Sequence, residues 1–242
     1  MINQDWQDRT RLLTGDEGIE HMNKASVLIV GLGGVGAVAA EYICRAGIGN
    51  MTIVDHDTVH RTNRNRQLPA LVSTEGMLKA NVVASRLMDI NPGLKLTVIK
   101  KYLKDESIIE VLAPGFDYVV DAIDTLSPKV YLLHECIENG LKVVSSLGSG
   151  AKFNPLQIRI SDISESYKCP LAYYLRKRLH KLGVKEGIKV VFSPEEPAGN
   201  VIVKTEAEQN KKSTRGTISY MPAIFGSYCA SVVIRELLGI DL

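Results

Sequence analysis

Short, largely apolar runs alternate with stretches of helical periodicity over the first 150 residues. The runs lie at 26–30, 51–54, 94–99, 117–120 and 142–146. Between two of them, Ala80, Val83 and Leu87 recur at helical spacing, and Lys79 and Arg86 fall off this apolar stripe. Parallel strands are buried and need helical crossovers. The alternation therefore predicts an α/β fold, a Rossmann-like, doubly wound and mostly parallel sheet with helices on both faces.

The pattern changes after residue 150. The runs 156–160 and 188–192 predict further strands, and Cys169-Pro170 predicts a helix start, because proline suits a first helical turn. Residues 194–215 are rich in Pro, Glu, Lys, Asn and Gly, which predicts a long loop with disordered parts. We expect one domain over residues 1–242, with an N-terminal helical segment (1–25), a core (26–150) and a C-terminal β-strand and helix extension (151–242) for substrate binding.

Residues 216–234 contain no Asp, Glu, Lys or Arg, and this uncharged stretch is long enough to span a membrane. The segment also holds polar and helix-breaking residues such as Thr217, Ser219 and Pro222, which are costly in lipid. We therefore expect a buried helix packed on the sheet and no stable membrane span. Membrane association through this stretch remains an alternative.

Composition is that of an ordinary globular domain, with 45% hydrophobic and 23% charged residues, which excludes collagen-like and mostly disordered chains. The net charge of +2 excludes a generally basic protein. Locally, residues 167–189 carry seven Lys and Arg against Glu186 alone, a charge of +6 that could bind RNA phosphates or form a solvated helix face.

The four cysteines lack zinc-binding spacing, and no secretion signal opens the chain, so we expect reduced thiols and a cytoplasmic location.

A glycine-rich loop between the first strand and the next helix predicts a phosphate site. Bare backbone N–H groups at a helix N-terminus can approach phosphate oxygens closely. The candidate residues are Gly31, Gly33, Gly34 and Gly36. Asp55 ends the second strand, where a carboxylate can accept hydrogen bonds from ribose hydroxyls. Taken alone, this pattern also fits an NAD-dependent dehydrogenase, a nucleotide-sensing module or a tight packing turn without a ligand.

Three further elements follow in order along the chain. They are the polar segment Asn63-Arg64-Asn65-Arg66-Gln67, the helix lysine Lys79 and the strand-end pair Asp121 and Asp124. Together with the glycine loop and Asp55, this order resembles the ubiquitin-activating-enzyme-like (ThiF/MoeB/HesA) superfamily, whose smaller members adenylylate carboxylates with ATP. The resemblance implies that residues 26–150 form a nucleotide-binding core within an adenylylating domain.

The resemblance also implies individual roles. When a carboxylate attacks the α-phosphate, negative charge grows on the phosphoryl oxygens, and cations at Arg66 and Lys79 would stabilise it. Asp124 would hold Mg²⁺ against the departing pyrophosphate. For Asp121, capping the strand end is as good an explanation as ligand contact. The remaining implied nucleotide contacts are Asp55, Asp57, which could orient the polar segment, Asn63 and Gln67.

Arg11 precedes the first strand. In the superfamily, an arginine from such an N-terminal helix reaches the nucleotide site of the neighbouring subunit, which implies a homodimer and a catalytic role for Arg11. Arg9 is a competing candidate, and a solvated helix face remains an alternative.

Within the superfamily, the chain lacks the paired Cys-x-x-Cys motifs typical of sulfur-carrier-activating members. Residues 121–124, Cys169-Pro170-Leu171-Ala172 and 191–195 are more similar to the tRNA threonylcarbamoyladenosine dehydratase branch. This implies ATP-dependent cyclisation of N6-threonylcarbamoyladenosine at position 37 of tRNA. The alternative is an adenylylating enzyme for a ubiquitin-like sulfur carrier, with a SufE-like sulfur-transfer partner and Cys169 as a reactive or a merely packed thiol.

Overall fold

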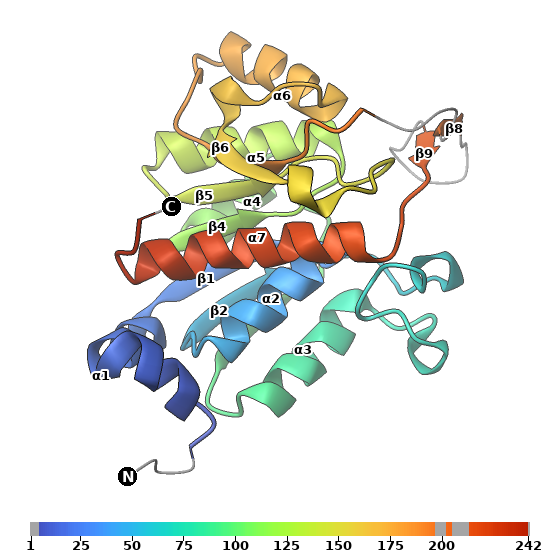
Figure 1. The fold of residues 1–242 in the computed structure, drawn as a ribbon. Helices are drawn as coiled ribbons and strands as arrows, with labels where there is room; N and C mark the ends of the chain where they lie inside the picture. The colour runs from blue at the N-terminus through green and yellow to red at the C-terminus, as the bar shows by residue number, and fades with distance from the viewer. Residues whose placement is uncertain (1–4, 197–201, 205–212, 242) are drawn as a thin grey trace.

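The computed structural model describes residues 5–196, 202–204 and 213–241 of the chain (Figure 1). Its α-helices are α1 (Asp8–Lys24), α2 (Gly36–Arg45), α3 (Lys79–Ile90), α4 (Glu106–Leu112), α5 (Leu126–Glu138), α6 (Pro170–Lys181) and α7 (Tyr220–Leu237). Its strands are β1 (Ser26–Val30), β2 (Asn50–Val54), β3 (Lys95–Ile99), β4 (Tyr118–Asp121), β5 (Val143–Ser146), β6 (Arg159–Asp162), β7 (Lys189–Phe192), β8 (Ile202–Lys204) and β9 (Ser213–Arg215).

Seven of these strands form one sheet in the order β3-β2-β1-β4-β5-β7-β6. Neighbouring strands are parallel, except that β6 runs antiparallel to β7. Val30 is in register with Val54 on one side and with Asp121 on the other, so β1, β2 and β4 end at the same level. The predicted Rossmann-like, mostly parallel sheet is confirmed.

The sheet separates two hydrophobic cores, because successive side chains of a strand point to opposite faces. Val27 and Ile29 of β1 pack with α2, α3 and α7, whereas Leu28 and Val30 pack with α4, α5 and α6. Figure 1 shows α7, α2 and α3 together on one face of the sheet, with α4 and α5 on the other. Helices cover both faces of the sheet, as predicted. Because both faces of each strand are then buried, the strand sequences are continuous apolar runs.

Helix boundaries follow local chemistry. Pro170 occupies the first position of α6, as the sequence predicts, and Cys169 is the residue before it. The helix α5 begins slightly earlier than its Ser-Pro signal suggests, with Thr125 as the preceding residue. It ends at Glu138 and is capped by Asn139, and Gly140 follows with a φ of 64°, a left-handed conformation that glycine adopts without strain.

Two predictions for the C-terminal extension are corrected. The strand predicted at 156–160 lies further along as β6, because Pro155–Gln157 forms a 3-10 turn. The long loop predicted at 194–215 contains two short antiparallel strands, β8 and β9. Residues 197–201 and 205–212 of this stretch lie outside the described residues, so the disorder predicted within 194–215 stays a prediction.

The uncharged stretch near the C-terminus forms most of α7. Met221, Phe225, Cys229 and Val233 are fully buried, and α7 packs closely along α2. The predicted buried helix on the sheet is therefore confirmed. Among the described residues, no helix combines the length and the apolar character needed to cross a membrane.

Candidate nucleotide site

The candidate site lies where β1, β2 and β4 end. The glycine loop follows β1, Asp55 follows β2, and Asp121 ends β4 with Asp124 three residues later. Since β1 lies between β2 and β4, the connections leaving the sheet here diverge to opposite faces. Such a switch point is where doubly wound sheets bind ligands.

Most of the glycine loop is constrained by packing. A Cβ on Gly36 would lie 1.8 Å from the Gly31 oxygen, and one on Gly34 would lie 2.8 Å from Pro222 Cβ of α7. Gly31 has a φ of 91°, and its Cβ would lie 2.8 Å from the Ala122 oxygen. These three glycines are required whether or not a ligand binds.

Gly33 differs from its neighbours. A Cβ there would meet nothing closer than Gln67 Nε2, at 3.7 Å. Beside it, Gln67 Oε1 is buried and has no hydrogen-bond partner among the described residues. A buried acceptor without a donor is costly in a folded protein. Open space at Gly33 and an unsatisfied acceptor at Gln67 therefore mark this part of the loop as a place for a ligand.

Asp55 links the glycine loop to β2. Its carboxylate accepts hydrogen bonds from the backbone N–H of Leu32 (2.6 Å) and of Asp57 (2.7 Å). Burial raises the pKa of Asp55 above its ordinary value, while the Lys79 ammonium and the two backbone donors reduce that shift. Asp55 thus shapes the loop in addition to any contact with a ribose.

Lys79 lies close to this carboxylate, as the first residue of α3. Its Nζ is 2.9 Å from Asp57 Oδ2, and its backbone N–H donates to the Asp57 oxygen. The side chain is only 7% exposed. The prediction that Lys79 lies away from the buried side of its helix is wrong. A residue at the end of a helix can contact the edge of the sheet whatever its position around the helix axis. Through these contacts, Asp57 orients Lys79.

The polar segment contributes Arg66, Asn63 and Gln67. Arg66 Nη1 donates to the Thr62 oxygen (3.0 Å) and to Asn65 Oδ1 (2.8 Å), and the side chain is partly exposed. Asn63 Oδ1 accepts from the His60 N–H at 3.0 Å. These local hydrogen bonds hold the segment in a fixed shape beside the glycine loop.

Asp121 and Asp124 have different environments. Asp121 is fully buried, where its carboxylate lies 2.7 Å from Lys129 Nζ and accepts from Ser145 Oγ (2.7 Å) and the Ile123 N–H (3.1 Å). Asp124 is exposed beyond the strand end. The contacts of Asp121 fit the strand-capping explanation, whereas Asp124 has the accessibility that a metal ligand needs.

Lys129, the buried partner of Asp121, was not among the predicted site residues. Lys129 Nζ also donates to the Ile123 oxygen (3.0 Å) and the Ser146 oxygen (2.8 Å). It therefore ties the segment that carries Asp124 to β5. A lysine within the apolar side of a predicted helix was the signal available in the sequence.

Arg11 does not reach its own chain's glycine loop. It pairs with Asp8 (2.8 Å) and Asp16 (3.0 Å) on α1, which is kinked at Gly15. The helix ends directly before β1, so α1 lies at the sheet edge where the strands begin, opposite the candidate site (Figure 1).

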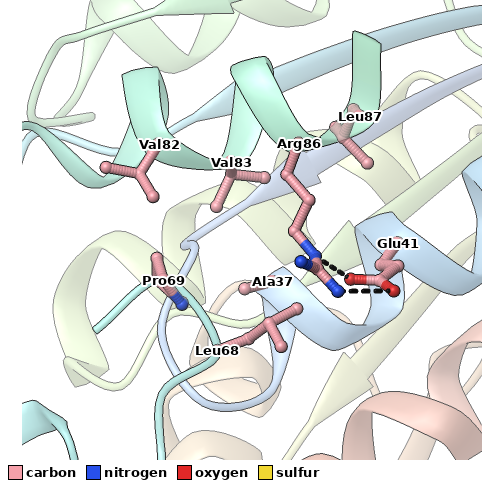
Figure 2. A pocket seen from close by; sticks show the side chains of 8 residues that line it. All are labelled: Ala37, Glu41, Leu68, Pro69, Val82, Val83, Arg86 and Leu87. Carbon is pink, nitrogen blue, oxygen red and sulfur yellow. Dashed lines mark hydrogen bonds and ion pairs between the residues drawn. The ribbon is translucent and has the colours of Figure 1, made fainter. Parts of the chain in front are cut away.

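Figure 2 shows a separate small pocket between α2, α3 and the 68–69 segment. Its polar groups are Glu41 and Arg86, whose side chains form a hydrogen-bonded ion pair with Arg86 Nε 2.5 Å from Glu41 Oε2. Ala37, Val83 and Leu87 supply much of the remaining lining. A neutralised ion pair among apolar side chains provides no phosphate-binding cation, so we do not assign the nucleotide here.

The basic stretch 167–189 is partly neutralised. Lys168 pairs with Glu196 and Lys189 with Glu236, both at 2.9 Å, while Arg176 donates inward to Ser166. The exposed cations that remain are Lys177, Arg178, Lys181 and Lys185. The predicted charge of +6 therefore overstates the cationic surface, which is concentrated on α6.

All four cysteines are buried and free. Burial raises the pKa of Cys44 to about 11 and that of Cys136 and Cys229 to about 12. Cys169 is 5% exposed and belongs to the core beneath α6. These environments favour the packed alternative for Cys169 over the reactive one.

The fold and the loop at its switch point are those of an α/β nucleotide-binding protein. The chain belongs to the ThiF family, whose model matches residues 7–242. The predicted resemblance is thereby confirmed.

Two bacterial relatives match nearly the whole length of the chain. The tRNA threonylcarbamoyladenosine dehydratase of Bacillus subtilis is 34% identical over 240 residues, covering 95% of this chain and 93% of that protein. The Escherichia coli protein of the same name is 34% identical over 258 residues, covering 98% and 96%. The crystal structure of the E. coli enzyme in complex with ATP aligns with a TM-score of 0.88 at 32% identity, over 99% of this chain and 97% of that one.

Proposed function

We propose that this protein catalyses the ATP-dependent dehydration of N6-threonylcarbamoyladenosine at position 37 of tRNA. The observation that carries the proposal is the end-to-end similarity to tRNA threonylcarbamoyladenosine dehydratases, one of which has been crystallised with ATP. The glycine loop and the open space at Gly33 support ATP as the co-substrate.

The reaction has two balanced steps. A carboxylate oxygen of the threonylcarbamoyl group attacks the α-phosphorus of ATP, and the bond to pyrophosphate breaks. A nitrogen of the same group then attacks the activated carbonyl carbon and loses its proton, while AMP leaves with the former carboxylate oxygen. The nucleoside thus loses one water without an external thiol or amine, which is consistent with the buried cysteines.

The chain's own residues would favour the first step electrostatically. Lys79, held by Asp57 beside the loop, and Arg66, at the partly exposed polar segment, would stabilise the charge that grows on the phosphoryl oxygens. Asn63 would donate a hydrogen bond to the nucleotide. The unsatisfied Oε1 of Gln67 would accept one from the nucleotide, and the Asp55 carboxylate would accept from the ribose hydroxyls.

Mg²⁺ fits best at Asp124. This carboxylate is exposed at the end of β4, and Mg²⁺ typically takes one or two protein carboxylates together with phosphate oxygens. The ligand atoms of Asp55, His56 and Asp57 also lie within 4.8 Å of one another. We favour Asp124 because it is exposed, whereas Asp55 is buried and holds the glycine loop through the Leu32 N–H. Bound there, Mg²⁺ would neutralise pyrophosphate charge.

A homodimer would complete the site. Arg11 is followed by Leu12 and Leu13, which are 75% and 87% exposed. Two large exposed leucines beside an arginine are suited to a protein contact, which would cover them and deliver Arg11 to the partner's nucleotide. We place this dimer in the cytoplasm, with tRNA as its substrate. A sulfur-transfer partner is not part of the proposal, because no cysteine of the chain is accessible.

Mass spectrometry of the nucleoside tests the proposal. Purified protein is incubated with ATP, Mg²⁺ and tRNA that carries N6-threonylcarbamoyladenosine, and the tRNA is then digested. We expect an ATP-dependent loss of one water, with AMP and pyrophosphate as products. Lys79→Ala should abolish the loss, whereas Lys142→Ala, at an exposed lysine on the opposite strand end, should not.

Two results would overturn the proposal. One is an unchanged nucleoside mass with active, folded protein. The other is pyrophosphate exchange that requires the Gly-Gly terminus of a ubiquitin-like carrier and proceeds without RNA, which would establish the alternative function.

A further inference from the structure

Two adjacent tyrosines near the start of α6 are exposed. Tyr173 and Tyr174 are 56% and 55% exposed, and their rings pack edge to face with centroids 5.3 Å apart. In this geometry, the edge of one ring covers a single face of the other, so ring faces remain open to solvent. Large exposed aromatic pairs on a soluble domain commonly mark a binding surface.

The same face of α6 is cationic. Ala172, Leu175 and Leu179 point into the core, so the opposite side of the helix carries both tyrosines together with Lys177 and Lys181. Residues three and four apart are neighbours on a helix, which places Lys177 one turn beyond the tyrosines. The helix contains no Asp or Glu.

The helix that carries this face is linked to the candidate nucleotide site through a neighbouring residue, Arg178. Arg178 Nη1 donates to Ser127 Oγ at 2.9 Å. Ser127 lies in the first turn of α5, three residues after Asp124. Figure 1 shows α6 beside α5 at the outside of its layer. A ligand on α6 can therefore extend toward the strand edge where ATP is proposed to bind.

We propose that Tyr173 and Tyr174 form a platform on which an unpaired base of the tRNA substrate stacks, while Lys177 and Lys181 bind the adjoining phosphates. This inference rests on the proposed function for the identity of the RNA. Exposed aromatic rings alternating with cations are how proteins bind single-stranded nucleic acid. A protein partner fits less well, because Lys177 and Lys181 share this face with the rings, and lysine is depleted in protein–protein interfaces.

Binding of fluorescein-labelled tRNA that carries N6-threonylcarbamoyladenosine tests the platform without requiring turnover. Tyr173→Ala/Tyr174→Ala should weaken binding by about 5-fold to 150-fold, as expected for one lost stacking contact. Tyr173→Phe/Tyr174→Phe should bind like the wild type, because phenyl rings also stack. Tyr42→Ala, which removes a tyrosine of 45% exposure from α2, is the matched control.

Salt dependence separates the two kinds of contact. Lys177→Gln should lower the slope of log affinity against log salt by about 0.7, whereas the alanine pair should leave that slope unchanged. As a spectroscopic check, Tyr174→Trp is placed in a Trp6→Phe background, since Trp6 is the chain's one tryptophan. Its emission should be quenched when the tRNA is added.

The outcomes distinguish this inference from the proposed function. Dehydration by the wild type, combined with unchanged tRNA affinity in the folded alanine pair, would overturn the platform and leave the proposed function intact. Ring-dependent tRNA binding and quenching without any dehydration would support the platform and overturn the proposed activity. Absence of tRNA binding by the wild type, with these tyrosines instead required to bind a protein, would overturn the platform.

Discussion

Lys129 and Asp121 form an ion pair at 2.7 Å in which both side chains are fully buried. Lys129 also holds the carbonyl oxygens of Ile123 and Ser146, so its ammonium connects β4, β5 and the segment that leads to Asp124. A charge in such a place is tolerated only while its partner is present.

Removal of the lysine should therefore destabilise the fold. Lys129→Met leaves Asp121 buried without its counter-ion and should lower the free energy of unfolding by about 3–5 kcal/mol. Chemical denaturation measures this loss. Adding Asp121→Asn should recover part of it, because the buried charge is then removed. The exposed Lys142→Met should change the free energy of unfolding by less than about 0.5 kcal/mol. A loss below about 1 kcal/mol for Lys129→Met would contradict the role assigned to the pair.

The same pair shows where sequence-based prediction stops. Alternating apolar runs predict the sheet, since burial of both faces leaves a direct mark on composition. The glycine loop and Asp55 are predictable, because local sequence order fixes them at consecutive strand ends. Lys129 is not, because its partners Asp121 and Ser146 come from two different strands. The burial of Lys79 was missed for a related reason, since helical periodicity does not show what a helix end contacts.

The surface charge of α6 illustrates a second limit. Summed along the sequence, residues 167–189 carry +6, but Lys168 and Lys189 pair with acidic residues that lie outside this stretch. A local sum cannot include partners brought near by folding. Conversely, the sum gives no weight to Tyr173 and Tyr174, whose exposure is visible only once the buried side of α6 is known.

Two glycine substitutions should separate folding from ligand binding. Gly36→Ala places a Cβ against backbone 1.8 Å away and should destabilise the protein by about 1–3 kcal/mol or more. Gly33→Ala meets only the end of the Gln67 side chain at 3.7 Å, so its thermal unfolding should be close to that of the wild type. Its ATP affinity, measured by calorimetry, should nevertheless fall, because the methyl group occupies the open face of the loop. Normal ATP binding by a folded Gly33→Ala would argue against phosphate contact at this position.

The raised pKa of Asp55 predicts a pH dependence for ATP binding. Burial is the main cause of the shift. In the proposed function the carboxylate form of Asp55 would accept hydrogen bonds from the ribose. On acidification, ATP affinity should therefore begin to fall at a higher pH than it would with an aspartate of ordinary pKa. For stability the sign is opposite: a raised pKa in the folded state means that the contribution of Asp55 is most favourable when protonated and is lost as pH rises through that pKa.

Comparison with Asp55→Asn isolates this effect from the titration of ATP itself. At neutral pH the variant should bind ATP roughly 10-fold to 100-fold more weakly, because a charge-assisted hydrogen bond is lost. Toward acid pH the two affinities should converge. Calorimetry across the range measures both curves. Parallel curves at every pH would mean that the Asp55 carboxylate does not contact the nucleotide.

Mixing two inactive variants tests whether Arg11 acts across a dimer. Arg11→Ala and Lys79→Ala should each be inactive as pure homodimers. In a hybrid dimer, the chain with Arg11→Ala keeps its own Lys79 and receives Arg11 from its partner, so one of the two sites is complete. Equal mixing makes about half of the dimers hybrids, and about a quarter of wild-type activity should return. Dehydration of tRNA measured before and after subunit exchange reports this recovery.

Mixing Arg11→Ala with a variant that also lacks Arg11, such as Arg11→Ala/Lys79→Ala, should restore nothing, because no subunit can then donate the arginine. Absence of recovery in the first mixture, with hybrid dimers verified by mass spectrometry, would place Arg11 outside the partner's site. Its role would then be limited to its ion pairs with Asp5, Asp8 and Asp16.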